Sequence, residues 1–304
     1  MRKVLVDANL EKLFQKQGYV KVPFISNKEV EELKQLFFDT LPQSGGQITA
    51  SDITTDAEHL ISYDFTFIDK NIAYKQQIFE IIKEYFKPHM EQLLLNYRPI
   101  IANYIRKKTN TGEVPLHQNW AFADERKCTT ISIWCPLVDS TVANGTLQVV
   151  PGSHKKFGEI RGPMIPWELD EIKNEIIEKH LIPLETKAGD CVILDDSILH
   201  YSPINHTDGL RLAIQLICVP NEEPSIHYHM NPSESRSEVN VLEVSDDFYM
   251  QFNPWKKPEN QKVIKTLNFK HKYINEDEFI KRMNAKPFDE EQKGFIEKLK
   301  SIFS

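Results

Sequence analysis

The chain has 304 residues, of which 40% are hydrophobic, and this is enough to form one large domain. Its 44 acidic residues exceed the 37 lysines and arginines, and the net charge of −7 argues against a nucleic-acid-binding surface. No apolar run approaches the length of a membrane span, and the N-terminus lacks the hydrophobic segment of a signal peptide. We expect a soluble, cytoplasmic protein, and its oligomeric state is not predicted.

The N-terminal third is predicted to be helical around one short strand. The run "GYVKVPFI" (18–25) is extended, and the "SNKE" that follows it places Ser26 and Glu29 at the spacing of a helix capping box. Apolar residues then recur at helical spacing. The segment 71–97 continues that period, and Pro88 predicts a break within it.

From Arg98 onward the pattern changes to short β-branched or aromatic runs separated by turn signals. These runs are "RPIIANYIRKK", "CTTISIWCPLV", "GTLQVV", "HLIPLET", "DCVILDD" and "RLAIQLICV". In the turn "ANGT", Gly145 is expected to adopt a positive φ. So many short strands favour a mainly β fold, a double-stranded β-helix of the jelly-roll, cupin-like kind, with flanking helices.

The C-terminal part is predicted to differ. After about residue 221 we expect the strands to stop and the amphipathic helices "EDEFIKRMN" and "EEQKGFIEKLKSIF" to follow. Residues 1–230 are therefore assigned to the β domain with its N-terminal helices, and residues 231–304 to a helical extension packed on the same domain. The four cysteines lie apart, without a CxxC pair, and are expected to be reduced core residues.

Two of the ten histidines follow predicted strands at places where the strand ends of one barrel could converge. His117 lies in "VPLHQNW", and His200 closes "GDCVILDDSILH". Two imidazoles and one oxygen ligand on one face of an octahedral ion describe the 2-His-1-carboxylate site of non-heme iron oxygenases. Arg211, on the next predicted strand, could bind a carboxylate of a cosubstrate through its planar fork.

These residues resemble the phytanoyl-CoA dioxygenase family of iron(II)- and 2-oxoglutarate-dependent oxygenases. The resemblance extends from "GYVKVPFISNKEVEEL" to "RLAIQLICVP" and is densest in "PLHQNW", "SIWCPLVDSTVANGTLQVVPGSHK" and "GDCVILDDSILHYSPINHTDGLRLAI". It implies that His117 and His200 bind Fe(II) and that Arg211 binds the distal carboxylate of 2-oxoglutarate. It also implies that Lys107 and Trp134 help to form the cosubstrate pocket, and that the protein uses O₂ and a small-molecule substrate.

The chain departs from the family pattern at Asn119, where the family has an aspartate. Asn119 could bind the metal through its amide oxygen, or Glu125 or Asp124 could supply the missing charge. The position could instead be vacated, as in related halogenases, or the chain could be an inactive protein that only binds a small molecule. A hard ferrous ion favours an anionic ligand, so we expect a substitute charge and retained oxygenase chemistry.

The substrate side of the site is less well defined by the sequence. Trp120 and Phe122 stand two residues apart and could form one apolar wall beside the metal, or they could be core residues. Arg161, Trp167 and Arg236 are candidate substrate contacts on loops, or surface residues. We expect a small polar metabolite or a natural-product intermediate as the substrate, hydroxylated at an unactivated C–H bond.

Overall fold

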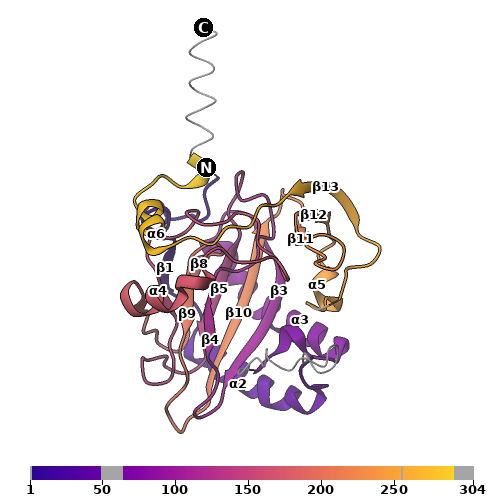
Figure 1. Cartoon of the computed structure of the whole chain (residues 1–304). Helices are drawn as coiled ribbons and strands as arrows, with labels where there is room; N and C mark the ends of the chain where they lie inside the picture. The colour runs from indigo at the N-terminus through magenta and orange to yellow at the C-terminus, as the bar shows by residue number, and fades with distance from the viewer. Residues whose placement is uncertain (1, 49–63, 255, 291–304) are drawn as a thin grey trace.

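The strand-like runs of the sequence form two main antiparallel sheets in a computed structural model that describes residues 2–48, 64–254 and 256–290 (Figure 1). The larger sheet has the strand order β1 (Tyr19–Pro23), β8 (Asp190–Asp195), β5 (Ile131–Pro136), β10 (Arg211–Pro220), β3 (Tyr97–Lys107) and β2 (Asp64–Phe65). The smaller sheet has the order β4 (Val114–His117), β9 (His200–Ser202), β6 (Gln148–Val149) and β7 (Ile182–Pro183). The predicted jelly-roll core with flanking helices is confirmed.

Alternation along the central strands gives the larger sheet two different faces. On β10, Leu212, Ile214, Leu216 and Cys218 belong to the hydrophobic core beneath the helices. The intervening residues Arg211, Gln215 and Ile217 instead line a cavity on the opposite face. One face of the sheet therefore stabilises the fold, and the other is available for a binding site.

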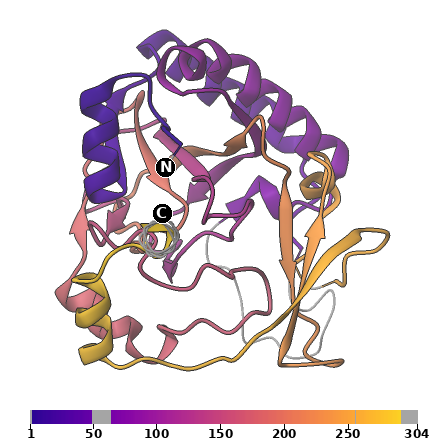
Figure 2. The same ribbon diagram turned by 90° about the horizontal axis from the view of Figure 1, so that it is seen from above.

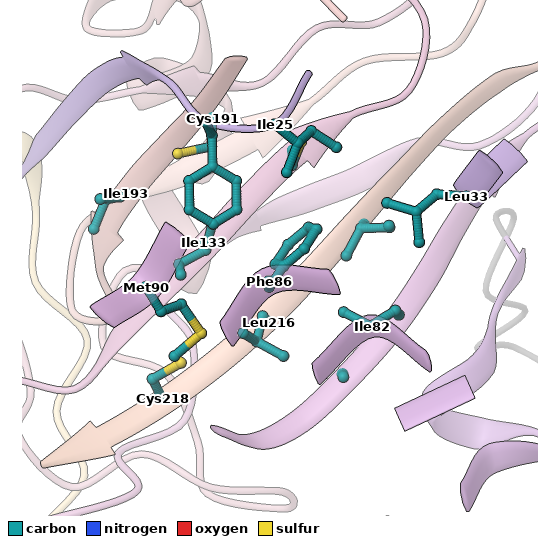
Figure 3. Packing of buried hydrophobic residues seen from close by; sticks show 14 of the residues in the cluster. Ile25, Leu33, Ile82, Phe86, Met90, Ile133, Cys191, Ile193, Leu216 and Cys218 are labelled. Carbon is teal, nitrogen blue, oxygen red and sulfur yellow. The ribbon is translucent and has the colours of Figure 1, made fainter. Parts of the chain in front are cut away.

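The helices α1 (Ala8–Gln17), α2 (Asn27–Thr40) and α3 (Ile72–Leu93) lie on the core side of the larger sheet (Figure 2). Figure 3 shows Ile82, Phe86 and Met90 of α3 directed at Leu216 and Cys218 of β10. These apolar residues recur every four positions, so they form one stripe on the helix.

The predicted break at Pro88 is wrong, because α3 continues through this proline to Leu93. Phe86 and Met90 are buried on either side of it. Burial of this continuous stripe offsets the loss of one main-chain hydrogen bond. The capping box at the start of α2 is confirmed: the main-chain N–H of Ser26 donates to Glu29 at 2.8 Å, and that of Glu29 donates to Ser26 at 3.3 Å.

The expectation that strands stop near residue 221 is wrong. Strands β11 (Ile226–His229), β12 (Glu238–Glu243) and β13 (Lys262–Asn268) form a third antiparallel sheet, with α5 (Phe248–Gln251) between the last two. Strand β13 is exposed along almost its whole length, so it lacks the alternation that marks a half-buried strand. The predicted helix at 276–284 is confirmed as α6 (Glu276–Met283), whereas the next predicted helix lies almost wholly outside the described residues.

The remaining elements are short. Helix α4 (Lys173–Lys179) occupies the charged insert, and 3₁₀ turns span Leu41–Gln43, Thr66–Ile68 and Asp170–Ile172. The four cysteines are buried and free, as expected for reduced core residues. In the described part of the chain, no helix combines the length and apolarity that a membrane span requires.

Candidate metal centre

His117 and His200 face each other across the smaller sheet. His117 ends β4, His200 begins β9, and the two are direct partners in the register of this antiparallel pair. The centroids of their rings lie 4.1 Å apart. The predicted convergence of the two strand ends is therefore seen in the fold.

Both imidazoles are held in the same way. Nδ1 of His117 lies 2.7 Å from the carbonyl oxygen of Pro115, and Nδ1 of His200 lies 3.0 Å from that of Ile198. Because a carbonyl can only accept, each Nδ1 must donate, and each neutral ring carries its lone pair on Nε2. Burial lowers the pKa of both rings, and the neighbouring His117 lowers that of His200 further. Both histidines are thus in the neutral form that binds metal ions.

Asn119 borders the same cavity as the two histidines and is buried. Its side-chain Nδ2 donates to Oδ1 of Asp196 at 2.8 Å and to Oγ of Ser132 at 2.9 Å. Its main-chain N–H donates to the carbonyl oxygen of Asp196 at 2.9 Å. Burial raises the pKa of Asp196 to about 7. Asn119, which stands where the family has an aspartate, is therefore hydrogen-bonded to the buried carboxyl group of Asp196.

The two candidate substitute carboxylates, Glu125 and Asp124, form ion pairs with basic side chains. Both oxygens of Glu125 accept from Arg161, at 2.6 and 2.7 Å, and both residues are buried. Asp124 pairs with Lys127 at 3.1 Å, and its side chain is 41% exposed. Across residues 2–48, 64–254 and 256–290, no three His, Cys, Asp or Glu side chains form a group suited to a metal ion. The geometry gives no support to a displaced carboxylate ligand.

Arg211 begins β10 and is almost completely buried beside the cavity. Its Nη2 donates to Oγ of Ser202 at 3.0 Å, while Nε and Nη1 find no hydrogen-bond partner among the described residues. Burial lowers the pKa of Arg211 to about 9. A buried guanidinium with unused donors is suited to an anion, and a carboxylate fits its geometry.

Lys107 supports this region from behind. It pairs with Arg211 in the β3–β10 register, and its Nζ donates to the carbonyl oxygens of Ser202 and Pro203, at 3.0 and 2.7 Å. Burial and the charge of Arg211 lower the pKa of Lys107 to about 6. Lys107 is absent from the described lining of the cavity. In this structure it holds the strand that contacts Arg211.

A cavity of about 370 Å³ lies between the two main sheets and joins these groups. Trp134 of β5 lines it beside Arg211, whose guanidinium carbon is 5.5 Å from the centroid of the indole ring. Trp120 and Phe122 also line it, with ring centroids 6.4 Å apart. Its apolar wall includes Phe65, Phe67, Ile68, Ile101, Ile105, Trp120, Phe122 and Ile217.

The three loop residues have different positions. Arg161 is buried against Glu125, and its Nε donates to the carbonyl oxygen of Asn119 at 2.7 Å. Nε1 of Trp167 donates to Oε1 of Gln118 at 3.1 Å, and Arg236 is exposed. Sequence reasoning missed Asp196 and Ser132, although a carboxylate beside the apolar run "CVIL" was a usable signal.

These residues fit an iron ion and 2-oxoglutarate. Two neutral imidazoles with their Nδ1 atoms occupied, and an amide oxygen beside them, form a nitrogen and oxygen donor set. Arg211 supplies unused donors in the same cavity. The metal ligands and the guanidinium for the cosubstrate would therefore come from three segments of the chain, which carry His117 and Asn119, His200, and Arg211.

A double-stranded β-helix with a pair of imidazoles and a buried guanidinium in its cavity is typical of metal-dependent oxygenases. The family model of phytanoyl-CoA dioxygenase (PhyH) matches residues 14–213. The chain belongs to this family, whose members are Fe(II)- and 2-oxoglutarate-dependent dioxygenases.

Curated relatives share part of the sequence. The chain is 32% identical over 140 residues to phytanoyl-CoA dioxygenase domain-containing protein 1 homolog of Dictyostelium discoideum, covering 43% of this chain and 49% of that protein. It is 33% identical over 134 residues to phytanoyl-CoA dioxygenase 1 of Oryza sativa subsp. japonica, covering 41% and 46%. The chain thus spans about half the length of these relatives.

Solved structures share the fold. The non-heme alpha ketoglutarate dependent epimerase SnoN from nogalamycin biosynthesis superposes with a TM-score of 0.52 at 17% identity, covering 86% of this chain and 96% of that one. The carbocyclase SnoK from the same biosynthesis also gives 0.52, at 15% identity, covering 72% and 86%. At these identities the likeness supports the fold alone.

Proposed function

We propose that the protein is an Fe(II)- and 2-oxoglutarate-dependent dioxygenase that hydroxylates an unactivated C–H bond of a small molecule. The observation that carries this proposal is the single cavity shared by His117, His200 and Arg211. When bound, iron and 2-oxoglutarate together supply the oxidising chemistry with O₂, and the cosubstrate leaves as succinate and CO₂. Membership of the family supports the same assignment.

The protein side chains provide binding and orientation in this proposal. His117 and His200 hold the metal through Nε2, and Asn119 offers its amide oxygen as a neutral third ligand. Arg211 takes the distal carboxylate of 2-oxoglutarate through its unused donors, with Trp134 beside it. Because the amide of Asn119 is neutral, we expect the metal to bind more weakly than it would with a carboxylate in this position.

The cavity wall indicates which part of the substrate lies near the metal. The aromatic and aliphatic side chains that line the space, including Trp120 and Phe122, exclude water and favour an apolar portion of the substrate. This supports oxidation at a C–H bond of a small metabolite or natural-product intermediate. The SnoN epimerase has been solved with Fe3+, alpha ketoglutarate and nogalamycin RO, so the same fold accommodates a natural product there.

Two alternatives differ in chemistry. Halogenation needs an empty ligand position for halide, and the side chain of Asn119, tethered at 2.8 and 2.9 Å, occupies that position. An inactive protein that only binds a small molecule is the second candidate. It is favoured by one observation, the lack of a third acidic or imidazole ligand among the described residues.

Anaerobic titration with Fe(II) and 2-oxoglutarate separates these candidates. We expect a weak visible charge-transfer band that Arg211→Ala abolishes, and succinate formation once O₂ is admitted. Ligand binding that persists in EDTA, without metal uptake measured by calorimetry, would instead support the inactive binding protein and contradict the dioxygenase.

A further inference from the structure

The contacts around Asn119 determine which end of its amide faces the cavity. Oγ of Ser132 donates its single proton to Oδ1 of Asp196 at 2.6 Å, so it can only accept from Asn119. Oδ1 of Asp196 accepts that proton and, as a carboxylate oxygen, has none of its own to donate. Two acceptors require the nitrogen of Asn119 on their side, so its oxygen must lie on the other side.

The other side of the amide is the histidine side. The side chain of Asn119 lies close enough to the His117 ring to raise its pKa against the larger, opposite effect of burial, and both residues line the cavity with His200. The main chain at Asn119 is also fixed, by its N–H to Asp196 at 2.9 Å and by Arg161 to its carbonyl oxygen at 2.7 Å. The residue can therefore change its amide orientation only by breaking its bonds to Asp196 and Ser132.

We propose that Asp196 is a positioning residue that turns the amide oxygen of Asn119 toward the metal. With the opposite orientation the amide would present NH₂, which carries no lone pair suited to a metal ion. A carboxylate that accepts from the amide nitrogen also increases the electron density on the amide oxygen. The proposed metal ligands thus include no carboxyl group, but the carboxyl group of Asp196 is hydrogen-bonded to one of them, Asn119. This inference rests on the proposed function, because it assumes that a metal binds at His117 and His200.

The arrangement predicts a specific coupling between two positions. Asn119→Asp alone would place a second carboxylate within hydrogen-bonding distance of Asp196, and the two would repel each other. The double variant Asn119→Asp with Asp196→Asn moves the acid to the ligand position and the amide behind it. It keeps one acid and one amide in the pair.

The test measures Co(II) affinity by calorimetry in the whole 304-residue chain, with fold checked by circular dichroism. We expect Asp196→Ala, which removes the acceptor for Asn119, to weaken Co(II) binding by about 10- to 100-fold, as is typical when a residue that orients a ligand is changed. The matched control is Asp190→Ala, on the strand that leads to Asp196 and away from the cavity, with unchanged affinity. We expect the double variant to bind Co(II) at least about tenfold more tightly than Asn119→Asp alone.

A second readout needs neither metal nor a variant. In metal-free protein labelled with ¹⁵N-asparagine, the side-chain NH₂ of Asn119 should exchange slowly with solvent, because both of its protons are used in buried hydrogen bonds. Rapid exchange of this group would overturn the proposal.

The outcomes separate this inference from the proposed function. A folded Asp196→Ala variant with wild-type Co(II) affinity overturns the positioning role and leaves the dioxygenase standing. Equal affinity of Asn119→Asp and of the double variant also overturns it. If the wild-type protein takes up no metal at His117 and His200, the proposed function fails, and the positioning role fails with it.

Discussion

Arg161 binds both carboxylate oxygens of Glu125, with Nη2 at 2.6 Å from Oε1 and Nη1 at 2.7 Å from Oε2. Both side chains are buried, and Arg161 also bonds the carbonyl oxygen of Asn119. The ion pair therefore fixes the loop that carries Asn119 to the segment around Arg161. A carboxylate engaged in this way is a structural group in this fold.

The first prediction concerns this ion pair. Glu125→Ala should lower the free energy of unfolding by about 3–5 kcal/mol, because it leaves Arg161 as an uncompensated buried charge. Metal affinity of the folded variant should stay close to that of the wild type. Urea denaturation and calorimetry measure the two quantities. Loss of metal binding with unchanged stability would make Glu125 a ligand and contradict our assignment.

The second prediction concerns Arg211. Arg211→Ala should weaken 2-oxoglutarate binding by about 100-fold or more, since a buried charged hydrogen-bonding partner is lost. Arg211→Lys should recover only part of this affinity, because an ammonium group cannot bind a carboxylate bidentately. Calorimetry in the presence of Mn(II) gives the affinities. Arg236→Ala is the control, since Arg236 is exposed, and it should bind 2-oxoglutarate as the wild type does.

The third prediction uses tryptophan fluorescence. Trp134 lines the cavity beside Arg211, whereas Trp167 bonds Gln118 and is absent from the described cavity lining. Binding of 2-oxoglutarate should change the emission of the wild type and of Trp167→Phe, but much less that of Trp134→Phe. The affinity of Trp134→Phe should fall by about three- to tenfold, because the better cation–π surface is lost. A binding-induced emission change in Trp134→Phe as large as that of the wild type would place the cosubstrate elsewhere.

The fourth prediction compares two glycines that share a φ of +75°. A Cβ at Gly145 would lie 2.2 Å from the carbonyl oxygen of Pro203, whereas one at Gly46 would meet no atom within 4 Å. Gly46→Ala should cost about 1 kcal/mol from backbone strain alone. Gly145→Ala should cost clearly more and also weaken 2-oxoglutarate binding, because the Gly145 oxygen accepts from Ser202, which contacts Arg211. Thermal denaturation and calorimetry measure both effects, and equal costs would contradict the clash.

The fifth prediction concerns acid stability. Burial opposes ionisation of Glu29, but hydrogen bonds from Ser26 and His89 lower its pKa from 4.5 to about 2. A lowered pKa means that the carboxylate stabilises the fold above pH 4.5 and that this contribution is lost as the pH falls from 4.5 toward 2. Glu29→Gln should lower the free energy of unfolding by about 2 kcal/mol at pH 6, after allowance for partial exposure, and should change it little near pH 2.

Urea denaturation across this range tests the acid-stability prediction. Glu31→Gln, at an exposed position of the same helix, should follow the wild type at every pH. A Glu29→Gln variant that loses as much stability at pH 2 as at pH 6 would contradict the assignment.

Most of what the sequence predicted about the fold and the site rested on the pattern of the strands and on the spacing of the polar residues. Alternation within the runs at 98–219 reflects one face on the core and one on the cavity, so the class of fold could be predicted. The adjacency of His117 and His200 was expected only in general terms. Their strands are four and three residues long, and the register of such short strands depends on the surrounding sheet.

The contacts missed by sequence reasoning join distant segments. Asn119 and Asp196 are 77 residues apart, and Glu125 and Arg161 are 36 apart. A buried polar residue requires some partner, but nothing local in the sequence identifies which one. The proposed substitute charge was therefore sought near Asn119 in the chain, at Asp124 and Glu125, whereas the carboxyl group that touches Asn119 comes from Asp196.

The contact between Asn119 and Asp196 also limits the order in which such a site can evolve. In an ancestor with the family's aspartate at position 119, an acid acquired first at position 196 would lie within hydrogen-bonding distance of a second buried carboxylate. The exchange to asparagine must then precede or accompany it. Once both changes are made, reversal at position 119 alone would bring two buried carboxylates together, so we expect the two positions to change together.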